Sequence, residues 1–551
     1  MRFTFLHILL IVWIQQSYAQ ELNIQYASYF GGSGEDFPIQ STSDATNHVY
    51  VVGYTESDDF PTTSGAHQET FGGGSSDGFI MKFNPDHTLA WSTYFGGENV
   101  DVINDIAIYN DIIYMIGYTY SSSGVVNGNF GTTSINGIGD GMIIAMTPNG
   151  ETIWSGYVGG NSDDFLNGLT TDQNGNIYVV GGTQSSSGIT TSDAFQQTIQ
   201  GLTDGWVAKM NDNGEVVWSS YFGGMGIDRF NDICETAVGN FACVGKTSSD
   251  DLYTTANAHQ QNIAGNGDGM FCMLNSSGSP LYSTYIGGDA QDDLQKIISF
   301  NGKLAGIGNT SSQSGLITGT NPFQTDYGGS LQDGFQLSFD ELTLDLGISY
   351  IGGDGFDECH SLYVKENQLW IAMSTSSINL PYDASFENEG WGMSDAYFIA
   401  FNDNFVRIYS GYIRGIYPDN AKTLVVSDHI RIFGNNYLLS DYTTPNAYSS
   451  EPAGMGDLLY TVLSNPLNLA EHAMDKTLVT YPNPCSNVIH IDLPKDDWKI
   501  QVFDSQGRLQ QEVFNSNSTH QNIHTNAMSS GVYHIRCIGT RSTYTGTLMK
   551  E

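Results

Sequence analysis

Seven aspartates recur at intervals of about 64 residues, each four residues after a Tyr-x-Gly-Gly motif or its degenerate last copy. If the repeats are arranged in a ring, carboxylates from successive repeats could meet at one end of it and hold a hard cation such as Ca²⁺. Alternatively, each carboxylate accepts backbone N–H groups in the turn between two repeats. We favour the turn, because every repeat needs one whereas a site needs only some of the residues. The seven are Asp36, Asp101, Asp164, Asp228, Asp292, Asp357 and Asp419.

A second set of seven aspartates precedes a Gly, Ala or Leu, and we interpret these residues as closing the turn before a strand. They are Asp77, Asp140, Asp204, Asp268, Asp333, Asp395 and Asp457.

Adjacent acids such as Asp163 and Asp164 would point to opposite faces of a strand, which is poor geometry for a glycosidase. The chain has no Gly-x-Ser-x-Gly or His-Glu-x-x-His motif. We therefore predict no catalytic residue, no metal ligand and no cofactor.

The elements that position these aspartates are short strands. In one unit we expect strands over residues 103–108, 112–117, 142–146 and 152–158, separated by turn residues. Four-stranded units repeated around an axis are the blades of a β-propeller. The sequence therefore predicts an all-β, seven-bladed propeller over residues 20–464.

The two ends of the repeat region predict how the ring closes. The region begins with a lone strand, Ile24–Phe30, of the type that ends each unit. It ends with a strand, Leu458–Leu463, whose own fourth strand is missing. We expect the first strand to complete the last blade.

The links between strands differ in length, and this indicates where a partner would bind. The links between second and third strands run to about 20 residues, for example 56–76, whereas the other links within a blade are tight hairpins. Loops on a rigid scaffold commonly carry binding, so we place any partner site on the long-loop face. Trp391, Arg407 and Arg414 break the repeat pattern in the last two units.

Residues 1–19 have the pattern of a secretory signal peptide, with Arg2, an apolar stretch and a small-x-small site ending at Ala19. We expect no transmembrane segment in the mature chain. The formal net charge of −40 argues against nucleic acid as a partner.

The six cysteines do not settle whether the chain contains disulfide bonds. Cys234 and Cys243 could pair across a hairpin or be buried free thiols, and Cys485 and Cys537 could also pair.

The repeat pattern is lost over residues 465–476, which we interpret as a linker. Residues 477–551 alternate apolar and polar residues between turns and predict a small β-sandwich. This segment resembles the type A C-terminal sorting domain of the type IX secretion system. The matching residues are Tyr481, Pro482, Asn483, Pro484, Gly507, Gly531, Tyr533 and Lys550.

The repeats are similar to the SBBP-type β-propeller repeat, through Tyr-Phe-Gly-Gly, Gly-x-Thr and Asp-Gly motifs such as Gly53, Thr55 and Asp77-Gly78. The two resemblances together imply a secreted or cell-surface protein of the outer membrane. Such a protein is exported through the periplasm and is recognised by the type IX machinery through its C-terminal domain. In that family the domain is often removed and the remainder attached to surface lipopolysaccharide.

We expect a non-enzymatic binding or adhesion protein whose ligand is an extracellular glycan or protein. The alternative is a secreted polysaccharide- or peptide-degrading hydrolase or lyase with its site on the long-loop face. A third interpretation is a ring stabilised by calcium held by the seven inner aspartates.

Overall fold

The computed structural model describes residues 24–127, 133–320, 322–329, 331–387, 394–414, 420–436, 443–454 and 456–464 in the first part of the chain. In the second part it describes residues 476–477, 480–481, 488–492, 498–504, 509–515, 520–526, 528–538 and 543–550. The chain separates into two compact units, residues 1–464 and residues 465–551. The predicted signal peptide and, apart from Lys476, the predicted linker lie outside the described residues. Within those residues, no helix is long and apolar enough to cross a membrane.

The described residues of the first unit form seven sheets, here called blades 1 to 7; six consist of four antiparallel strands, and blade 6 has five strands. Blade 1 holds β2 (Asp36–Ser43), β3 (Val49–Thr55), β4 (Asp77–Phe83) and β5 (Leu89–Phe95). Blade 2 holds β6 (Asp101–Tyr109), β7 (Ile112–Thr119), β8 (Asp140–Met146) and β9 (Thr152–Val158). Blade 3 holds β10 (Asp164–Thr171), β11 (Ile177–Thr183), β12 (Asp204–Met210) and β13 (Val216–Phe222). Blade 4 holds β14 (Asp228–Glu235), β15 (Phe241–Thr247), β16 (Asp268–Leu274) and β17 (Pro280–Ile286).

Blade 5 holds β18 (Asp292–Phe300), β19 (Lys303–Thr310), β20 (Asp333–Phe339) and β21 (Leu346–Ile351). Blade 6 holds β22 (Asp357–Lys365), β23 (Gln368–Thr375), β25 (Asp395–Asn402) and β26 (Arg407–Arg414). It also carries a fifth strand, β24 (Ala384–Glu387), which pairs parallel to β26 and was not expected from the sequence. Blade 7 holds β27 (Thr423–Val426), β28 (His429–Asn436), β29 (Asp457–Ser464) and the first strand, β1 (Ile24–Phe30).

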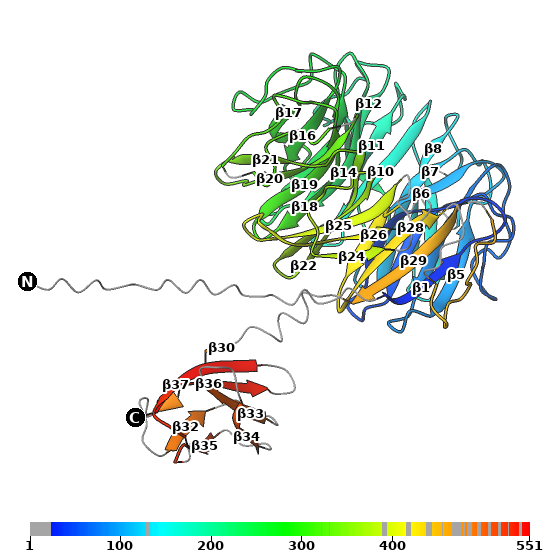
Figure 1. Ribbon diagram of the computed structural model, residues 1–551. Coiled ribbons are helices and arrows are strands. Elements are labelled where there is room, and N and C mark those ends of the chain that lie inside the picture. The colour runs from blue at the N-terminus through cyan, green and yellow to red at the C-terminus, as the bar shows by residue number, and fades with distance from the viewer. Residues whose placement is uncertain are drawn as a thin grey trace, which may run out of the picture. The chain divides into compact units, whose positions relative to one another are not determined.

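The first strands of the blades form the inner wall of a ring. These inner strands contact one another in chain order, from β2 through β6, β10, β14, β18 and β22 to β27. Strand β27 in turn contacts β2, so the series returns to its start. Figure 1 shows the blades fanned around this axis. The all-β propeller expected from the repeat is confirmed.

The predicted closure is also observed. Strand β1 pairs antiparallel with β29, placing Phe30 opposite Leu458 and Ala27 opposite Thr461. The pairing covers the edge of β29 that would otherwise expose unpaired backbone groups. It also ties the beginning of the ring to its end, so that blade 7 is complete only when both ends of the repeat region are folded.

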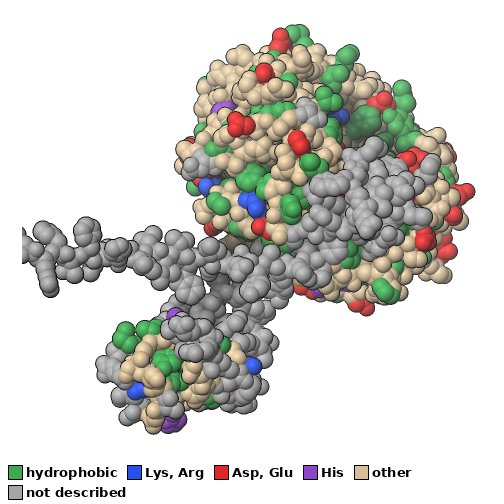
Figure 2. All heavy atoms as spheres, in the orientation of Figure 1, with side chains coloured by type: hydrophobic (Ala, Val, Ile, Leu, Met, Phe, Trp, Pro, Cys, Tyr) green, Lys and Arg blue, Asp and Glu red, His purple; other side chains and the backbone are tan. Residues whose placement is uncertain are grey.

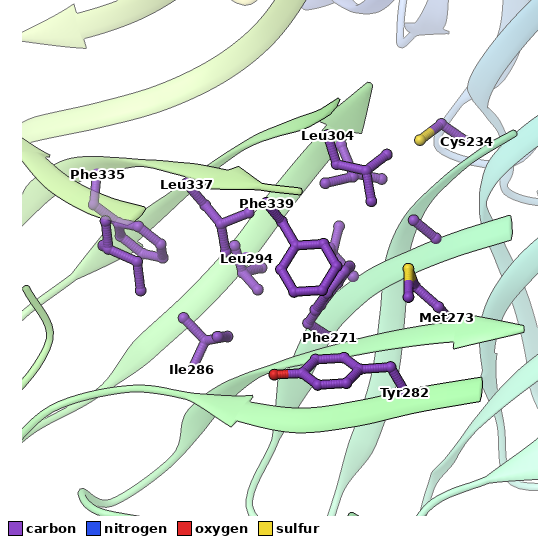
Figure 3. Close-up of a cluster of buried hydrophobic side chains, with 14 of the residues drawn as sticks. Cys234, Phe271, Met273, Tyr282, Ile286, Leu294, Leu304, Phe335, Leu337 and Phe339 are labelled. Atoms are coloured by element: carbon purple, nitrogen blue, oxygen red, sulfur yellow. The ribbon is translucent and has the colours of Figure 1, made fainter. Parts of the chain in front are cut away.

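Apolar side chains on both faces of the strands hold neighbouring blades together. All seven residues of β4, for example, are buried. Between blades 4 and 5, the ring of Phe339 lies 4.9 Å from that of Phe271 and 5.2 Å from that of Tyr282. Figure 3 shows these rings pointing into one cluster with Leu294 and Leu337. Because adjacent sheets share such clusters, each blade depends on its neighbours for its buried surface.

The described cysteines are free thiols, so a Cys234–Cys243 disulfide is excluded. The hairpin register places Cys243 opposite Ile233 and Cys234 opposite Ala242. The two thiols are therefore one position out of register and point to opposite faces of the blade. Cys537 is likewise buried and free, and Cys485 lies outside the described residues.

The second unit consists of two sheets. One has the order β30 (Lys476–Thr477), β37 (Thr543–Lys550), β36 (Gly531–Ile538), β33 (Trp498–Asp504) and β34 (Leu509–Asn515). The other has the order β31 (Thr480–Tyr481), β32 (Val488–Asp492) and β35 (His520–His524). Residues of both sheets, including Ile491, Trp498 and Ile523, form one apolar core. This arrangement is the expected sandwich, with β30, β35 and β37 added to the strands predicted from the sequence.

Candidate functional site

The inner-strand aspartates are held within the turns that join the blades. Asp36 accepts hydrogen bonds from the Gly32 backbone N–H at 2.8 Å and the Ser57 hydroxyl at 3.2 Å, and it also bonds the Thr55 hydroxyl. The same three kinds of donor recur in four other blades, at Asp164, Asp228, Asp292 and Asp357. Asp101 accepts the equivalent Gly and Ser donors, and Asp419 lies outside the described residues.

In four of the turns a glycine lies between an inner-strand aspartate and an aspartate of the second set, at Gly31, Gly96, Gly159 and Gly223. A Cβ at Gly96 would lie 2.6 Å from Asp77 Cγ and 2.9 Å from Asp101 Oδ2, so no side chain fits there. Burial, reinforced by the neighbouring carboxylate and opposed by hydrogen bonds, raises the pKa of Asp36 and Asp77 to about 7. These acids are tightly enclosed parts of the turn.

The geometry of the aspartates does not resemble an open ring of metal ligands. The six described members of the inner set are buried, and each accepts a backbone hydrogen bond from a glycine through one oxygen. Among the residues that the structure describes, no group of three or more His, Cys, Asp or Glu side chains is placed to hold a metal ion.

A different set of residues, located around the ring axis, differs in chemical character from blade to blade. We define the axial belt as the second residue of each inner strand in blades 1 to 6 together with its partner on the next strand. The pairs are Phe37–Tyr54, Val102–Tyr118, Phe165–Gly182, Arg229–Lys246, Asp293–Asn309 and Glu358–Ser374. Blades 1 to 3 contribute apolar and aromatic groups, and blades 4 to 6 contribute charged and polar groups. The belt lies at the end of the ring where the inner strands begin, which is the long-loop face.

In the charged half, Asp293 lies beside two cations. Its Oδ2 is 3.7 Å from Arg229 Nη2 and 3.8 Å from Lys246 Nζ, and its Oδ1 accepts a hydrogen bond from Asn231 at 2.7 Å. Burial raises the pKa of Asp293, while the charges of Lys246 and Arg229 oppose the shift. The Arg229 side chain is 43% exposed and that of Lys246 is 31% exposed, so both cations keep a face toward solvent.

A second polar contact joins blade 6 to blade 7 and blade 1. His360 Nε2 lies 3.4 Å from Lys422 Nζ, which also stands 5.4 Å from the centre of the Phe37 ring. Burial and the charge of Lys422 lower the pKa of His360 well below its usual value. The imidazole is therefore neutral, and its contact with Glu358 at 3.4 Å is not an ion pair.

The aromatic half offers half-buried ring faces. Phe37 stacks on Tyr54 with ring centres 5.4 Å apart. Tyr118 packs edge-on against Phe165 at 5.3 Å and against Tyr120 at 6.1 Å. Aromatic faces can stack on the C–H face of a sugar ring, and cations can pair with acidic groups, so the two halves of the belt suit one ligand that carries both features.

Behind the belt, six inner strands carry a β-bulge, and the extra residue is polar in five of them. Asp105 accepts the Leu169 backbone N–H at 2.7 Å, and Asp232 accepts that of Ile297 at 2.8 Å. Lys296 Nζ lies 4.0 Å from Asp232 Oδ1. Burial acts to lower the pKa of Lys296, but Asp232 and Asp105 outweigh it and raise that pKa. These contacts link neighbouring blades, blade 2 to blade 3 and blade 4 to blade 5.

The sequence had indicated that Trp391, Arg407 and Arg414, and not the belt residues, break the symmetry of the repeat. Arg407 lies on the outer strand β26, where it bonds Asp383 and Ser410. The Arg414 side chain and Trp391 lie outside the described residues. The belt residues were missed, although comparing the second residue of each inner strand would have revealed them.

The sorting residues lie in the second unit. Gly531 pairs with Lys550 across β36 and β37. Tyr533 is buried, and its hydroxyl donates to the Ser529 carbonyl at 2.9 Å. Tyr481 lies in β31. The other sorting residues, Pro482, Asn483, Pro484 and Gly507, lie outside the described residues.

Family models match both units. Residues 479–551 match the secretion system C-terminal sorting domain, and residues 153–188 match the β-propeller repeat of the SBBP type. No curated protein matches the chain.

Several solved structures are similar at low identity. A protein of unknown function from Dyadobacter fermentans is 9% identical, with 80% of this chain and 99% of that one covered and a TM-score of 0.38. PorZ, a surface component of the type IX secretion system of Porphyromonas gingivalis, is 14% identical, with 92% and 68% covered and a TM-score of 0.30. The endosialidase of phage phi92 is 9% identical, with 95% and 87% covered and a TM-score of 0.37. Similarity at this level says nothing about activity.

The sorting domain implies recognition by the type IX machinery after passage through the periplasm. The chain is therefore a secreted or cell-surface β-propeller protein that carries an SBBP-type repeat and a type IX C-terminal sorting domain.

Proposed function

We propose that the protein is a non-enzymatic binding or adhesion protein whose axial belt captures an acidic extracellular glycan. The observation that carries the proposal is the break in repeat symmetry at the belt. There, Arg229 and Lys246 stand side by side with Asp293 as their shared counter-ion, opposite a half ring of aromatic residues. A uronic or sialic type of sugar would offer a carboxylate to the cations and a C–H face to the rings.

The acidity of the chain does not prevent such binding. Acidic side chains are spread over the visible face of the propeller, with few Lys or Arg among them (Figure 2). At physiological salt, charges more than about 8–10 Å apart are largely screened. The partly exposed Arg229 and Lys246 therefore set the local field for a ligand that reaches the belt.

The mature chain, residues 20–551, would be screened on an array of acidic and neutral glycans. We expect acidic glycans to bind, and we expect Arg229→Ala combined with Lys246→Ala to weaken them at least about tenfold, the loss of one charge-assisted contact. Lys365→Ala, at the far end of inner strand β22, is the control and should leave binding unchanged. Unaltered binding by the double variant, or binding of proteins alone, would contradict the proposal.

The same samples test the enzymatic alternative. The bound glycans would be incubated with the chain, and new reducing ends or unsaturated ends would be measured. Cleavage that the double variant abolishes would replace the binding role with a hydrolase or lyase role at the same belt.

A further inference from the structure

One blade lacks an aromatic side chain that the other six share. The residue three positions before the recurrent Tyr of the outer strand is Gly347 in blade 5, on β21. In the other blades this position holds Tyr26, Trp91, Trp154, Trp218, Tyr282 and Tyr409.

The aromatic residue normally fills the space against the next blade's outer hairpin. Trp91 donates its indole N–H to the Pro148 carbonyl at 3.0 Å, and Trp218 donates to the Ser276 carbonyl at 3.0 Å. A Cβ added to Gly278, in that hairpin, would lie 2.8 Å from the Trp218 ring. The contact between blades at these positions is therefore closely packed.

At Gly347 the space is only partly taken. The hairpin of blade 6 places Phe405 where other hairpins have Gly150, Gly214 or Gly278. A pocket of 610 Å³ remains, lined by Gly347 and Phe405 and by Phe323 from the long loop of blade 5. It lies at the outer edge of the ring and shares no residue with the axial belt.

The wall of the pocket carries a second departure from the repeat. Gln336 on β20 occupies a position that is apolar in every other blade, with Ile80, Ile143, Val207, Phe271, Phe398 and Tyr460 as the equivalents. In Figure 3, Phe335, Leu337 and Phe339 point into the cluster shared with blade 4, so strand alternation turns Gln336 and Ser338 to the opposite face.

The side-chain amide of Gln336 has no hydrogen-bond partner among the described residues. Its side chain lines the pocket and is 4% exposed, and it makes no hydrogen bond within the described part of the chain. The amide borders the pocket, where it can meet solvent or a ligand. A mere packing defect would leave an apolar hole, whereas this cavity pairs a missing aromatic residue with an unsatisfied amide.

We propose that this lateral pocket binds one or two rings of a neutral sugar. Phe323 and Phe405 offer ring faces for stacking, and the Gln336 amide both donates to and accepts from sugar hydroxyls. The volume falls within the range of about 300–1,000 Å³ that is typical of ligand pockets. Lys303 lies at the rim near Asp340 and Asp345, so no excess of positive charge favours an acidic ligand.

Two variants of the mature chain test the site. Gly347→Trp restores the residue type of the other blades and plugs the pocket; the added Cβ would meet the Ser338 hydroxyl at 2.7 Å, and this hydroxyl can rotate away. Gln336→Ile installs the residue found in blades 1 and 2 and removes the amide without filling the pocket. The Arg229→Ala and Lys246→Ala double variant is the control, because it alters only the belt.

Neutral mono- and disaccharides of glucose, galactose, mannose and N-acetylglucosamine would be titrated by calorimetry. We expect at least one to bind, Gln336→Ile to raise its Kd at least about tenfold, and Gly347→Trp to abolish binding. The belt variant should keep the wild-type Kd, whatever becomes of acidic glycan binding. Absence of binding up to about 10 mM sugar, or binding that survives Gly347→Trp with an unchanged melting temperature, would overturn the proposal.

Discussion

Replacing Asp333 by Asn is expected to make the propeller more stable at pH 8, even though the carboxyl is buried in the core of a turn. Asp333 Oδ2 accepts the Gly328 backbone N–H at 2.6 Å, whereas Oδ1 is buried and receives no hydrogen bond from the described residues. Burial, opposed by the Gly328 bond and reinforced by the charge of Asp357, raises the pKa of Asp333 to about 7. The native state therefore prefers the protonated acid.

The magnitude follows from proton linkage. The unfolded carboxyl has a pKa near 4, so between about pH 4 and pH 7 the native state keeps a proton that the unfolded chain has released. The stability contributed by this group is complete below about pH 4 and is lost as the pH rises through 7. From pH 5 to pH 7 the loss is about 2.3 kcal/mol without screening, and partial access of solvent reduces it to about 1–2 kcal/mol. Asn keeps an acceptor for Gly328 and carries no charge, so the variant avoids this loss.

Urea denaturation of the mature chain, followed by Trp fluorescence at pH 5, 6, 7 and 8, measures the effect. The free energy of unfolding of Asp333→Asn relative to wild type should rise by about 1–2 kcal/mol across this range. Asp86→Asn is the control, because Asp86 is exposed and hydrogen bonds to Thr88 hold its pKa below the usual value. A difference that stays constant at all four pH values would show that native Asp333 is already ionised at pH 5.

Three further predictions concern the ring itself. Gly96→Ala should destabilise the propeller by about 1–3 kcal/mol in urea titrations, because the new methyl group meets two buried carboxyls, whereas Gly182→Ala, with its nearest neighbour at 3.3 Å, should cost far less. Lys296→Met should cost about 3–5 kcal/mol at pH 8 and less at pH 5, where the two aspartates left behind can take up protons. Deleting residues 20–30 should expose the edge of β29 and produce aggregates in size-exclusion chromatography, and a monomer of unchanged stability would contradict the closure described above.

The fold was predictable because the same turn and strand residues recur in successive units of the repeat. The interval between Gly-Gly turns set the strand bounds closely, and Ile24–Phe30 coincides with β1. The strands of the sandwich were predicted less completely, since β35 has a single apolar residue, Ile523, and β37 is interrupted by Gly546. The pairing of Cys234 with Cys243 was left open because a shift of one residue in a hairpin reverses which faces the side chains share.

The candidate sites were not predictable in the same way. A period is found by looking for what the units share, whereas the axial belt and the lateral pocket consist of residues in which the units differ. Gly347 looks like any other glycine until the six aromatic equivalents are set beside it. Gln336 looks like a surface residue until the register places it inside the blade interface. To recognise either residue as part of a site, one must know which residues of neighbouring blades are in contact, and a local sequence pattern does not show this.

The positions of the two proposed sites have a common physical basis. The Asp, Thr, Ser and Gly groups of the turns are bonded to one another in nearly the same way in each described blade, so a change there disturbs the connection between blades. The belt residues and the outer aromatic position lie beside this network and take no part in its hydrogen bonds. Side chains there can differ between blades while the frame stays intact, which is what a binding site built on a rigid scaffold requires. Because the two sites share no residue, changes at Arg229 and at Gly347 should act additively on stability and each on its own ligand.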